Sequence, residues 1–299
     1  MGPPSGRRRP GHGGSPRLKL LAPDEPIERP EAGGDQVSWK AGTQLLGRAF
    51  SLLIYLRDRD EPVTVGVLAE ALRLPPATVY RLVQTLELAG FVDRSFRPYL
   101  SLGLRFMDFG QAKQRQVARE LGPVAQPVLE ALTAATGETA LLVMPTGARA
   151  IRILSAEPSR ELRLSYRPGQ VLPLYAGASG KVLLPWLSAS LLESALAQGD
   201  GQLLADGRRL TQAELRLQVA RIRADGYCIS HGELDADAAA VAAPVFLRGG
   251  QVFAAVSVAG PLAGFSPPRL PGLIERVRAA AVNLGSALAP LSGPGDEKL

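Results

Sequence analysis

Hydrophobic residues recur at three- and four-residue steps between positions 45 and 56, which predicts one amphipathic helix. The apolar positions of this repeat are Leu45, Leu46, Ala49, Leu52, Leu53 and Leu56. Pro62 disfavours helical geometry in the residue before it, so the helix should end within the charged segment 57–61. Ordered structure is therefore expected to begin near Thr43.

Two shorter helical patterns follow, separated by a tight break at residues 73–75. Thr64 can cap the first of these helices, and Pro75 or Pro76 suits the first turn of the second, which Gly90 is placed to end. The second helix has an apolar stripe formed by Val79, Leu82, Val83 and Leu86. Its other faces present Thr78, Tyr80, Arg81, Gln84 and Thr85. Two short helices joined by a short turn, the second with a polar face, predict a helix-turn-helix.

Residues 91–94 and 98–102 are typical of two short strands around a tip with Arg94 and Arg97, which together would form a wing. A wing can place arginine near DNA phosphates. A three-helix core with no role in DNA binding remains the alternative. The candidate DNA-binding residues are Thr64, Thr78, Tyr80, Arg81, Gln84, Thr85, Arg94 and Arg97.

Residues 104–120 predict a linker helix between the winged helix-turn-helix domain (43–103) and a second domain (121–290). Leu104, Phe106 and Phe109 on this helix are available to pack against a second copy of the chain.

The second domain alternates helical and strand patterns. A helical pattern over 124–135 ends at Gly137, and Thr211 with Glu214 forms a capping box that opens another helix, expected to stop at Gly226. The predicted strands are 139–144, 150–154, 162–166, 241–247 and 252–258, and a final helix is expected over 273–284. Hairpins bracketed by helices predict an α+β fold with an antiparallel sheet.

Residues 172–184 contain small residues followed by an apolar run, which is typical of a loop entering a helix. Free backbone N–H groups there would attract a carboxylate or phosphate. Tyr175 and Val182 stand where a phosphate-binding loop needs Gly and Ser or Thr, and Lys181 stands where a nucleophile elbow around Ser179 needs Gly. Lys181 is left with two roles, contact with a ligand or pairing with a local carboxylate.

The length of the chain and the distribution of its charges indicate how many domains it has and what kind of partner it binds. The chain has 299 residues, about two domain lengths, and 17 of its 34 basic residues but only 12 of its 28 acidic residues lie before position 116. The positive excess in that half points to a polyanionic partner, although a basic tail that only aids solubility is the alternative. The segments 1–42 and 291–299 have no apolar period and are expected to be disordered.

Several kinds of site are not expected. One cysteine, Cys228, and two histidines make a disulfide framework or a metal site improbable, and no cofactor or catalytic set is expected. No apolar run is long enough for a membrane span, so we expect a cytoplasmic protein with no membrane partner. Cys228 is expected to be a small buried residue.

The helix-turn-helix segment Leu74-Pro75-Pro76-Ala77-Thr78-Val79-Tyr80-Arg81-Leu82, followed by Tyr99-Leu100-Ser101-Leu102-Gly103, resembles the IclR family of bacterial transcriptional regulators. The resemblance continues through residues 172–184, Asp225-Gly226-Tyr227 with Glu233, and residues 242–246 and 256–261. Ala77 departs from the family, which usually has Ser there, so Thr78, Tyr80 and Arg81 must supply more of the contact.

The resemblance implies a GAF-like effector domain that binds a small organic acid. By that resemblance the acid would meet the backbone at Ala178, Ser179 and Gly180, with Ser230, Ala240 and Ser257 lining the rest of the site. Ala240 and Ala259 offer no polar atom, which favours an aromatic or hydrophobic acid.

Two readings of the function follow. The first is an effector-responsive transcriptional regulator of a metabolic operon, which binds an inverted repeat in double-stranded DNA as a homodimer or a dimer of dimers. The second is a small-molecule enzyme that uses Ser179, Lys181 and His231, with the N-terminal domain as an interaction module. The sequence leaves repression and activation equally open.

Overall fold

The computed structural model describes residues 43–59, 61–159 and 166–289. The predicted tails and nearly all of the strand expected over 162–166 lie outside these residues. Tyr166, the last residue of that expected strand, is described and is not in a strand.

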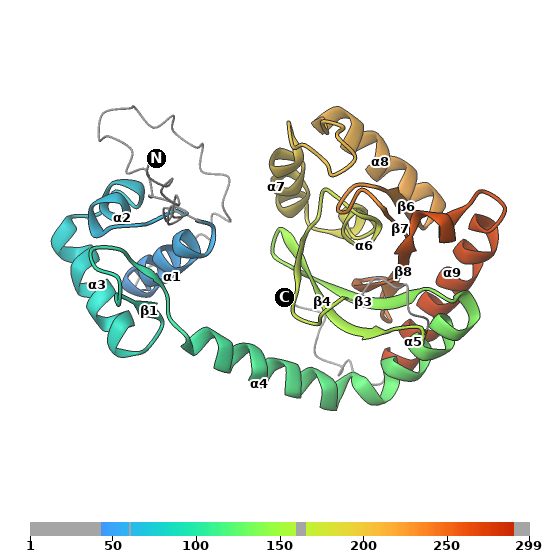
Figure 1. Ribbon diagram of the computed structural model, residues 1–299, viewed down its shortest axis with the longest axis horizontal. Helices are drawn as coiled ribbons and strands as arrows, with labels where there is room; N and C mark the ends of the chain where they lie inside the picture. The colour runs from blue at the N-terminus through green and yellow to red at the C-terminus, as the bar shows by residue number, and fades with distance from the viewer. Residues whose placement is uncertain (1–42, 60, 160–165, 290–299) are drawn as a thin grey trace, which may run out of the picture. The chain divides into compact units, whose positions relative to one another are not determined.

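Three helices and a small hairpin form the N-terminal part of the described chain (Figure 1). The helices are α1 (Gln44–Arg57), α2 (Val65–Ala71) and α3 (Pro76–Leu88), and the hairpin pairs β1 (Val92–Asp93) with β2 (Ser101–Leu102). Leu52, Leu68, Val79 and Val83 are fully buried where the three helices meet. The predicted helix-turn-helix with its wing is therefore confirmed.

Helix α4 (Arg105–Glu120) follows the hairpin and is polar along most of its length. Near its start the rings of Phe106 and Phe109 lie 5.1 and 5.5 Å from the ring of Phe91. These two side chains thus contact an aromatic ring of the same chain but stay 37% and 58% exposed, and Leu104 and Met107 are exposed as well.

The C-terminal part is built on one antiparallel sheet of six strands in the order β5-β4-β3-β8-β7-β6. The strands are β3 (Thr139–Thr146), β4 (Arg149–Ala156), β5 (Val171–Pro173), β6 (Cys228–His231), β7 (Ala238–Phe246) and β8 (Val252–Pro261). The α+β class and the antiparallel hairpins are as predicted.

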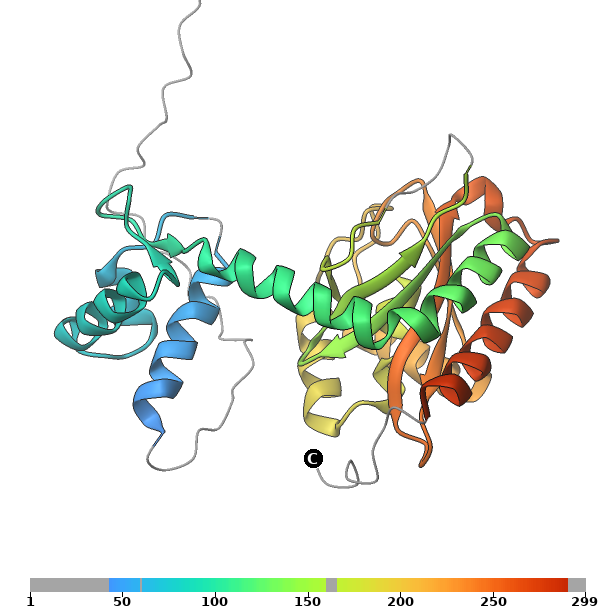
Figure 2. The ribbon, with the colours of Figure 1, turned by 90° about the horizontal axis from the view of Figure 1, so that it is seen from below.

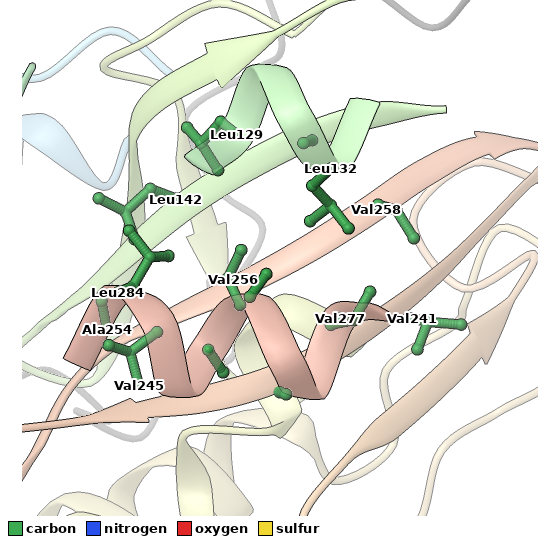
Figure 3. Packing of buried hydrophobic residues seen from close by; sticks show 14 of the residues in the cluster. Leu129, Leu132, Leu142, Val241, Val245, Ala254, Val256, Val258, Val277 and Leu284 are labelled. Carbon is green, nitrogen blue, oxygen red and sulfur yellow. The ribbon is translucent and has the colours of Figure 1, made fainter. Parts of the chain in front are cut away.

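Two long helices cover one face of this sheet. α5 (Gly122–Thr136) and α9 (Leu270–Leu288) lie side by side on it (Figure 2). Their apolar stripes meet inward-facing strand residues such as Leu142, Val256 and Val258, and Figure 3 shows this packing around Leu129 and Leu284. Burial of this apolar area is the main source of stability on this face.

Shorter elements cover the opposite face. They are α6 (Ala178–Lys181), a 3₁₀ turn at Leu184–Trp186, α7 (Ala189–Gly199) and α8 (Gln212–Asp225) (Figure 1). A further 3₁₀ turn, Leu262–Phe265, follows β8. Leu141, Leu183, Leu196 and Leu215 are fully or almost fully buried in this second core. The sheet therefore has two different faces, and the candidate site lies on the second.

Several helices begin or end at the residues that the sequence predicted. The capping box of Thr211 and Glu214 is present, and Gly137 and Gly226 end their helices in the left-handed conformation that glycine adopts readily. Helix α7 and strand β5 were not predicted. No helix among the described residues is long and apolar enough to cross a membrane.

Candidate functional site

The polar face of α3 is open to solvent. Val79 and Val83 are fully buried beneath it, so Tyr80, Arg81 and Gln84 project from the opposite side of the helix. Thr78, by contrast, is half-buried. The helix thus presents one aromatic, one cationic and one amide side chain, all three of which can contact base edges or phosphates.

Two of the candidate threonines make local hydrogen bonds. The Thr64 hydroxyl accepts from the Val67 amide at 3.3 Å and caps α2, as predicted, and the Thr85 hydroxyl donates to the Arg81 carbonyl at 2.9 Å. Thr64 therefore has a structural role in the N-terminal cap, and Thr85 remains exposed on α3.

The two arginines of the wing differ in how far their side chains are exposed to solvent. Arg94 was expected at the wing tip, but its side chain is only 14% exposed and lies 3.4 Å from Glu87, with the guanidinium 5.4 Å from the centre of the Tyr80 ring. Arg94 lies between β1 and β2, as expected, but its side chain packs against a carboxylate and an aromatic ring of α3 instead of projecting from the tip. Arg97 is exposed at the tip.

In the C-terminal domain, small residues on β6, β7 and β8 make room for α6 above the sheet. Ser230 pairs with Ala240 in the sheet, and Ala242 pairs with Ser257. A Cβ on Gly180 would lie 2.4 Å from the Pro173 carbonyl oxygen, so only glycine allows this approach.

Side chains from these strands hold α6 in place. The Ala178 amide donates to the Ser230 hydroxyl at 2.9 Å, and the Ser179 hydroxyl donates to the Ser257 hydroxyl at 2.8 Å. Of the predicted effector residues, Ala178, Ser179, Gly180, Ser230 and Ser257 are buried together here, and Ala240 is half-buried beside them.

The three backbone amides of the predicted anion site are not equivalent. Ala178 already donates to Ser230, whereas the amides of Ser179 and Gly180 donate to no acceptor among the described residues. A buried N–H group without a partner is costly, so these two amides are open to a ligand oxygen.

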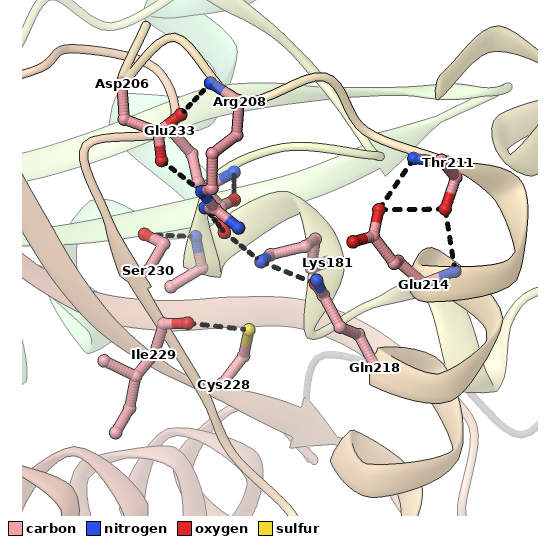
Figure 4. A network of polar contacts seen from close by, with 12 residues as sticks. Lys181, Asp206, Arg208, Thr211, Glu214, Gln218, Cys228, Ile229, Ser230 and Glu233 are labelled. Atoms are coloured by element: carbon pink, nitrogen blue, oxygen red, sulfur yellow. Dashed lines mark hydrogen bonds and ion pairs between the residues drawn. The ribbon is translucent and has the colours of Figure 1, made fainter. Parts of the chain in front are cut away.

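A buried ion pair lies next to this turn (Figure 4). The Lys181 ammonium is 2.5 Å from Glu233 Oε1 and 2.8 Å from Gln218 Oε1, while Glu233 Oε2 accepts from the Gly177 amide at 2.8 Å. Of the two roles open to Lys181, the structure shows pairing with a carboxylate. The pair joins two segments 52 residues apart and fixes the turn that precedes α6.

The enzyme reading required Ser179, Lys181 and His231 to act together. His231 is exposed at the end of β6, its side chain alternating with that of buried Ser230, and the hydroxyl of Ser179 bonds to Ser257. The three residues therefore do not form a nucleophile with its base.

Cys228 is buried on the same sheet face, as expected. Burial raises the pKa of its thiol to about 12, and the nearby Lys181 opposes this only in part. The thiol is therefore protonated and unreactive near neutral pH.

Sequence reasoning missed one cation on this face. Arg152 of β4 is only 7% exposed, and its Nε has no hydrogen-bond partner in the described chain. Burial lowers the pKa of Arg152, although an arginine stays charged at neutral pH. Nothing in the strand pattern of residues 150–154 marked this residue.

The comparisons with known proteins agree with this geometry. Residues 45–95 match the model of the IclR helix-turn-helix domain, and residues 116–285 match that of the bacterial transcriptional regulator IclR C-terminal domain. The chain belongs to the IclR family. It is a DNA-binding, effector-responsive transcriptional regulator.

This chain matches other members of the family over most of their length. The chain is 32% identical to the HTH-type transcriptional regulator KipR of Bacillus subtilis over 222 residues, which cover 74% of this chain and 88% of KipR. It is 29% identical to the HTH-type transcriptional repressor AllR of Klebsiella pneumoniae, covering 87% and 95% of the two chains.

Solved structures share the fold. The IclR transcriptional regulator from Alicyclobacillus acidocaldarius is 26% identical with a TM-score of 0.56, over 81% of this chain and 98% of that one. An IclR homologue from Microbacterium hydrocarbonoxydans, complexed with 4-hydroxybenzoate, is 22% identical with a TM-score of 0.55, over 83% and 100%. At 22% identity, the similarity to the Microbacterium protein shows a shared fold and says nothing about the ligand of this chain.

Proposed function

We propose that α3 is the helix that reads the operator. The observation that supports this is the exposed row of Tyr80, Arg81 and Gln84 above a fully buried stripe. Arg81 and Gln84 would contact base edges in the major groove, while Thr78, Thr85 and the exposed Arg97 of the wing would contact phosphates or sugars. Arg94 contributes indirectly, because it packs over the Tyr80 ring.

We propose that two copies of the chain bind two half-sites of an inverted repeat, as dimers of helix-turn-helix proteins do. Exposed Leu104 and Met107 at the start of α4 support self-association, as a homodimer or a dimer of dimers. We expect the target to be a metabolic operon, and repression is favoured because the AllR relatives are named transcriptional repressors. Because the proposed target is chromosomal DNA, we also propose a cytoplasmic location.

We propose that the C-terminal domain binds a small organic acid at the turn that begins α6. The effector carboxylate would accept hydrogen bonds from the amides of Ser179 and Gly180, and the hydroxyls of Ser230 and Ser257 would lie beside it. Ala178 and Ala240 would contact its apolar part. The two unpartnered amides are the observation that supports an anionic ligand here.

Binding at this turn would change operator affinity through α4. A coupling of about 1–3 kcal/mol is typical of such regulators and corresponds to roughly a five- to 150-fold change in affinity. The experiment is fluorescence anisotropy of the full-length protein on the DNA flanking its own gene, with and without a panel of organic acids. Tight binding that at least one acid changes is the expected result. Catalytic conversion of an acid with no DNA affinity would instead favour an enzyme.

A further inference from the structure

The tip of the wing carries an aromatic side chain that is open to solvent. Phe96 lies between β1 and β2 and is 81% exposed, more than any other aromatic side chain of the described residues. A single exposed apolar residue is ordinary on a protein surface, so the surroundings of Phe96 decide what it can do. Three features of those surroundings point to DNA.

The first feature is the order of the turn that presents the ring. The Asp93 carboxylate accepts from the Ser95 amide at 2.8 Å and from the Ser95 hydroxyl at 2.5 Å, which fixes the start of the turn. The Tyr99 amide donates to the Phe96 carbonyl at 3.0 Å and closes it. Because the backbone is already fixed, little conformational entropy is lost when the Phe96 ring meets a partner.

The second feature is the position of the wing beside the DNA-binding helix. Strand β1, from which the wing extends, packs against α3 (Figure 1). Arg94 directly follows β1, and its guanidinium lies 3.4 Å from Glu87 and 5.4 Å from the centre of the Tyr80 ring. Tyr80 belongs to the exposed row of α3. A duplex that occupies this row therefore passes next to the wing.

The third feature is the charge at the tip. Arg97, the residue after Phe96, is exposed and forms no ion pair with any described residue. The Asp93 carboxylate on the same wing is bonded to Ser95. Proteins that bind the minor groove combine such groups: cations meet the negative potential of the groove, and apolar side chains are inserted between base pairs.

We infer that Phe96 is a wedge that enters the minor groove next to the major groove occupied by α3, where its ring unstacks a base step and bends the operator. Arg97 contacts the phosphates beside that step. Pyrimidine–purine steps such as TA deform most easily, so the operator should have one where the wing meets it. This inference rests on the proposed role of α3 and adds the deformability of the flanking DNA to what the protein recognises.

The test measures the bend of the DNA in the complex with the full-length protein. A fragment centred on the footprint next to the protein's own gene carries a fluorophore at each end, so that energy transfer reports the bend. The natural protein should bend it by at least about 20° and make a thymine near the wing reactive to permanganate, which oxidises unstacked thymines. Phe96→Ala should lose the bend and the reactivity. It should bind roughly tenfold more weakly, since burial of a phenyl ring is lost.

Two further variants separate a wedge from an ordinary contact. Phe96→Leu should keep most of the bend, because leucine is also an apolar wedge. Leu88→Ala removes a side chain that is 90% exposed at the last residue of α3, and it should bind and bend DNA as the natural protein does. The unfolding temperature should be nearly unchanged in all three variants, because these side chains are exposed. Phe96→Ala should also keep the salt dependence of binding, because no charge is removed.

Four results would contradict the inference. A complex in which the operator is unbent would overturn it and leave the role of α3 intact. The same bend and permanganate pattern in the natural protein and in Phe96→Ala would overturn it even if binding weakened. Altered self-association of Phe96→Ala in analytical ultracentrifugation, with the bend unchanged, would assign the ring to a protein interface. If the natural protein bound no DNA, the proposed role of α3 would fail as well. The bend and the thymine reactivity of the natural complex need no variant, so they test the wedge even if Phe96→Ala does not fold.

Discussion

The two candidate sites of this chain use polar residues in opposite ways. On α3, Tyr80, Arg81 and Gln84 are exposed and lie opposite the buried stripe of the helix. In the C-terminal domain the polar side chains are buried and paired: Ser179 bonds to Ser257, Lys181 to Glu233, and Ser230 accepts from the Ala178 amide.

This contrast predicts how each site responds to mutation. Side chains on the exposed face of α3 can change with little effect on folding, so DNA recognition and stability are separable there. In the buried cluster each polar group satisfies another, so removing one leaves its partner unsatisfied. Ligand binding and stability should therefore change together at the effector site.

The largest effect is expected from Lys181→Met. It removes the closest cation from the buried Glu233 carboxylate and leaves only the largely exposed Arg208, 4.0 Å away; breaking a buried pair typically destabilises a protein by about 3–5 kcal/mol. Urea unfolding followed by Trp186 fluorescence, in a Trp39→Phe background, measures the change in the free energy of unfolding.

Arg216→Met provides the matched control for Lys181→Met. Arg216 forms an ion pair with Glu193 at 2.6 Å, but both side chains are about half exposed, so little change is expected. Equal stability losses in the two variants would show that burial does not distinguish the pairs.

Arg81→Ala tests the exposed site. It should weaken operator binding by about 1–3 kcal/mol and reduce the preference for one DNA sequence over another, because a base contact is lost. Thermal unfolding should be nearly unchanged. Arg115→Ala, an exposed arginine on α4, is the control, and an unaltered footprint in Arg81→Ala would refute the role given to α3.

Ser257→Ala tests whether the hydroxyls of the buried cluster depend on one another. Ser179 would lose the acceptor that lies 2.8 Å away, at an expected cost of about 1–3 kcal/mol in the free energy of unfolding. The double variant Ser179→Ala with Ser257→Ala should cost less than the sum of the two single variants. Simple additivity would mean that the hydrogen bond contributes nothing.

The buried thiol predicts a modest pH dependence. Burial raises the pKa of Cys228 from 9.0 to about 12, so the unfolded chain releases this proton at a lower pH than the folded chain. The contribution to stability is complete below pH 9 and falls as pH rises toward 12, by about 1 kcal/mol at pH 10. Relative to Cys228→Ala, the natural protein should lose that amount of stability between pH 7 and pH 10; parallel curves would contradict the assignment.

The smallest expected effect concerns the wing. Arg97→Ala should weaken binding to all DNA sequences alike and reduce the slope of log affinity against log salt by about one. Arg94→Ala should leave that slope unchanged, because its guanidinium already contacts Glu87 and Tyr80. Equal slopes in the two variants would show that the wing tip makes no phosphate contact.

Local patterns in the sequence predicted most of the fold and part of the site. The cap at Thr64, the capping box at Thr211 and the glycine end at Gly226 involve residues within three or four positions of one another, so their chemistry is visible in the chain. The buried stripe of α3 follows from helical spacing in the same way.

Long-range contacts and register could not be predicted in the same way. Lys181 and Glu233 are 52 residues apart, and Arg94 packs on α3 because of Tyr80 and Glu87 rather than its own neighbours. The face on which Arg152 lies depends on a single extra residue in β4. A strict two-residue alternation assigns it to the wrong face.

The most direct test of this account is a footprint of the full-length protein on the DNA flanking its own gene, at two salt concentrations, with and without an organic acid that changes operator affinity in the anisotropy panel. The account predicts protection of an inverted repeat, affinity that falls steeply with salt, and a shift in that affinity when the acid is added. No protection at either salt concentration would contradict it, and the N-terminal domain would then be an interaction module for another partner.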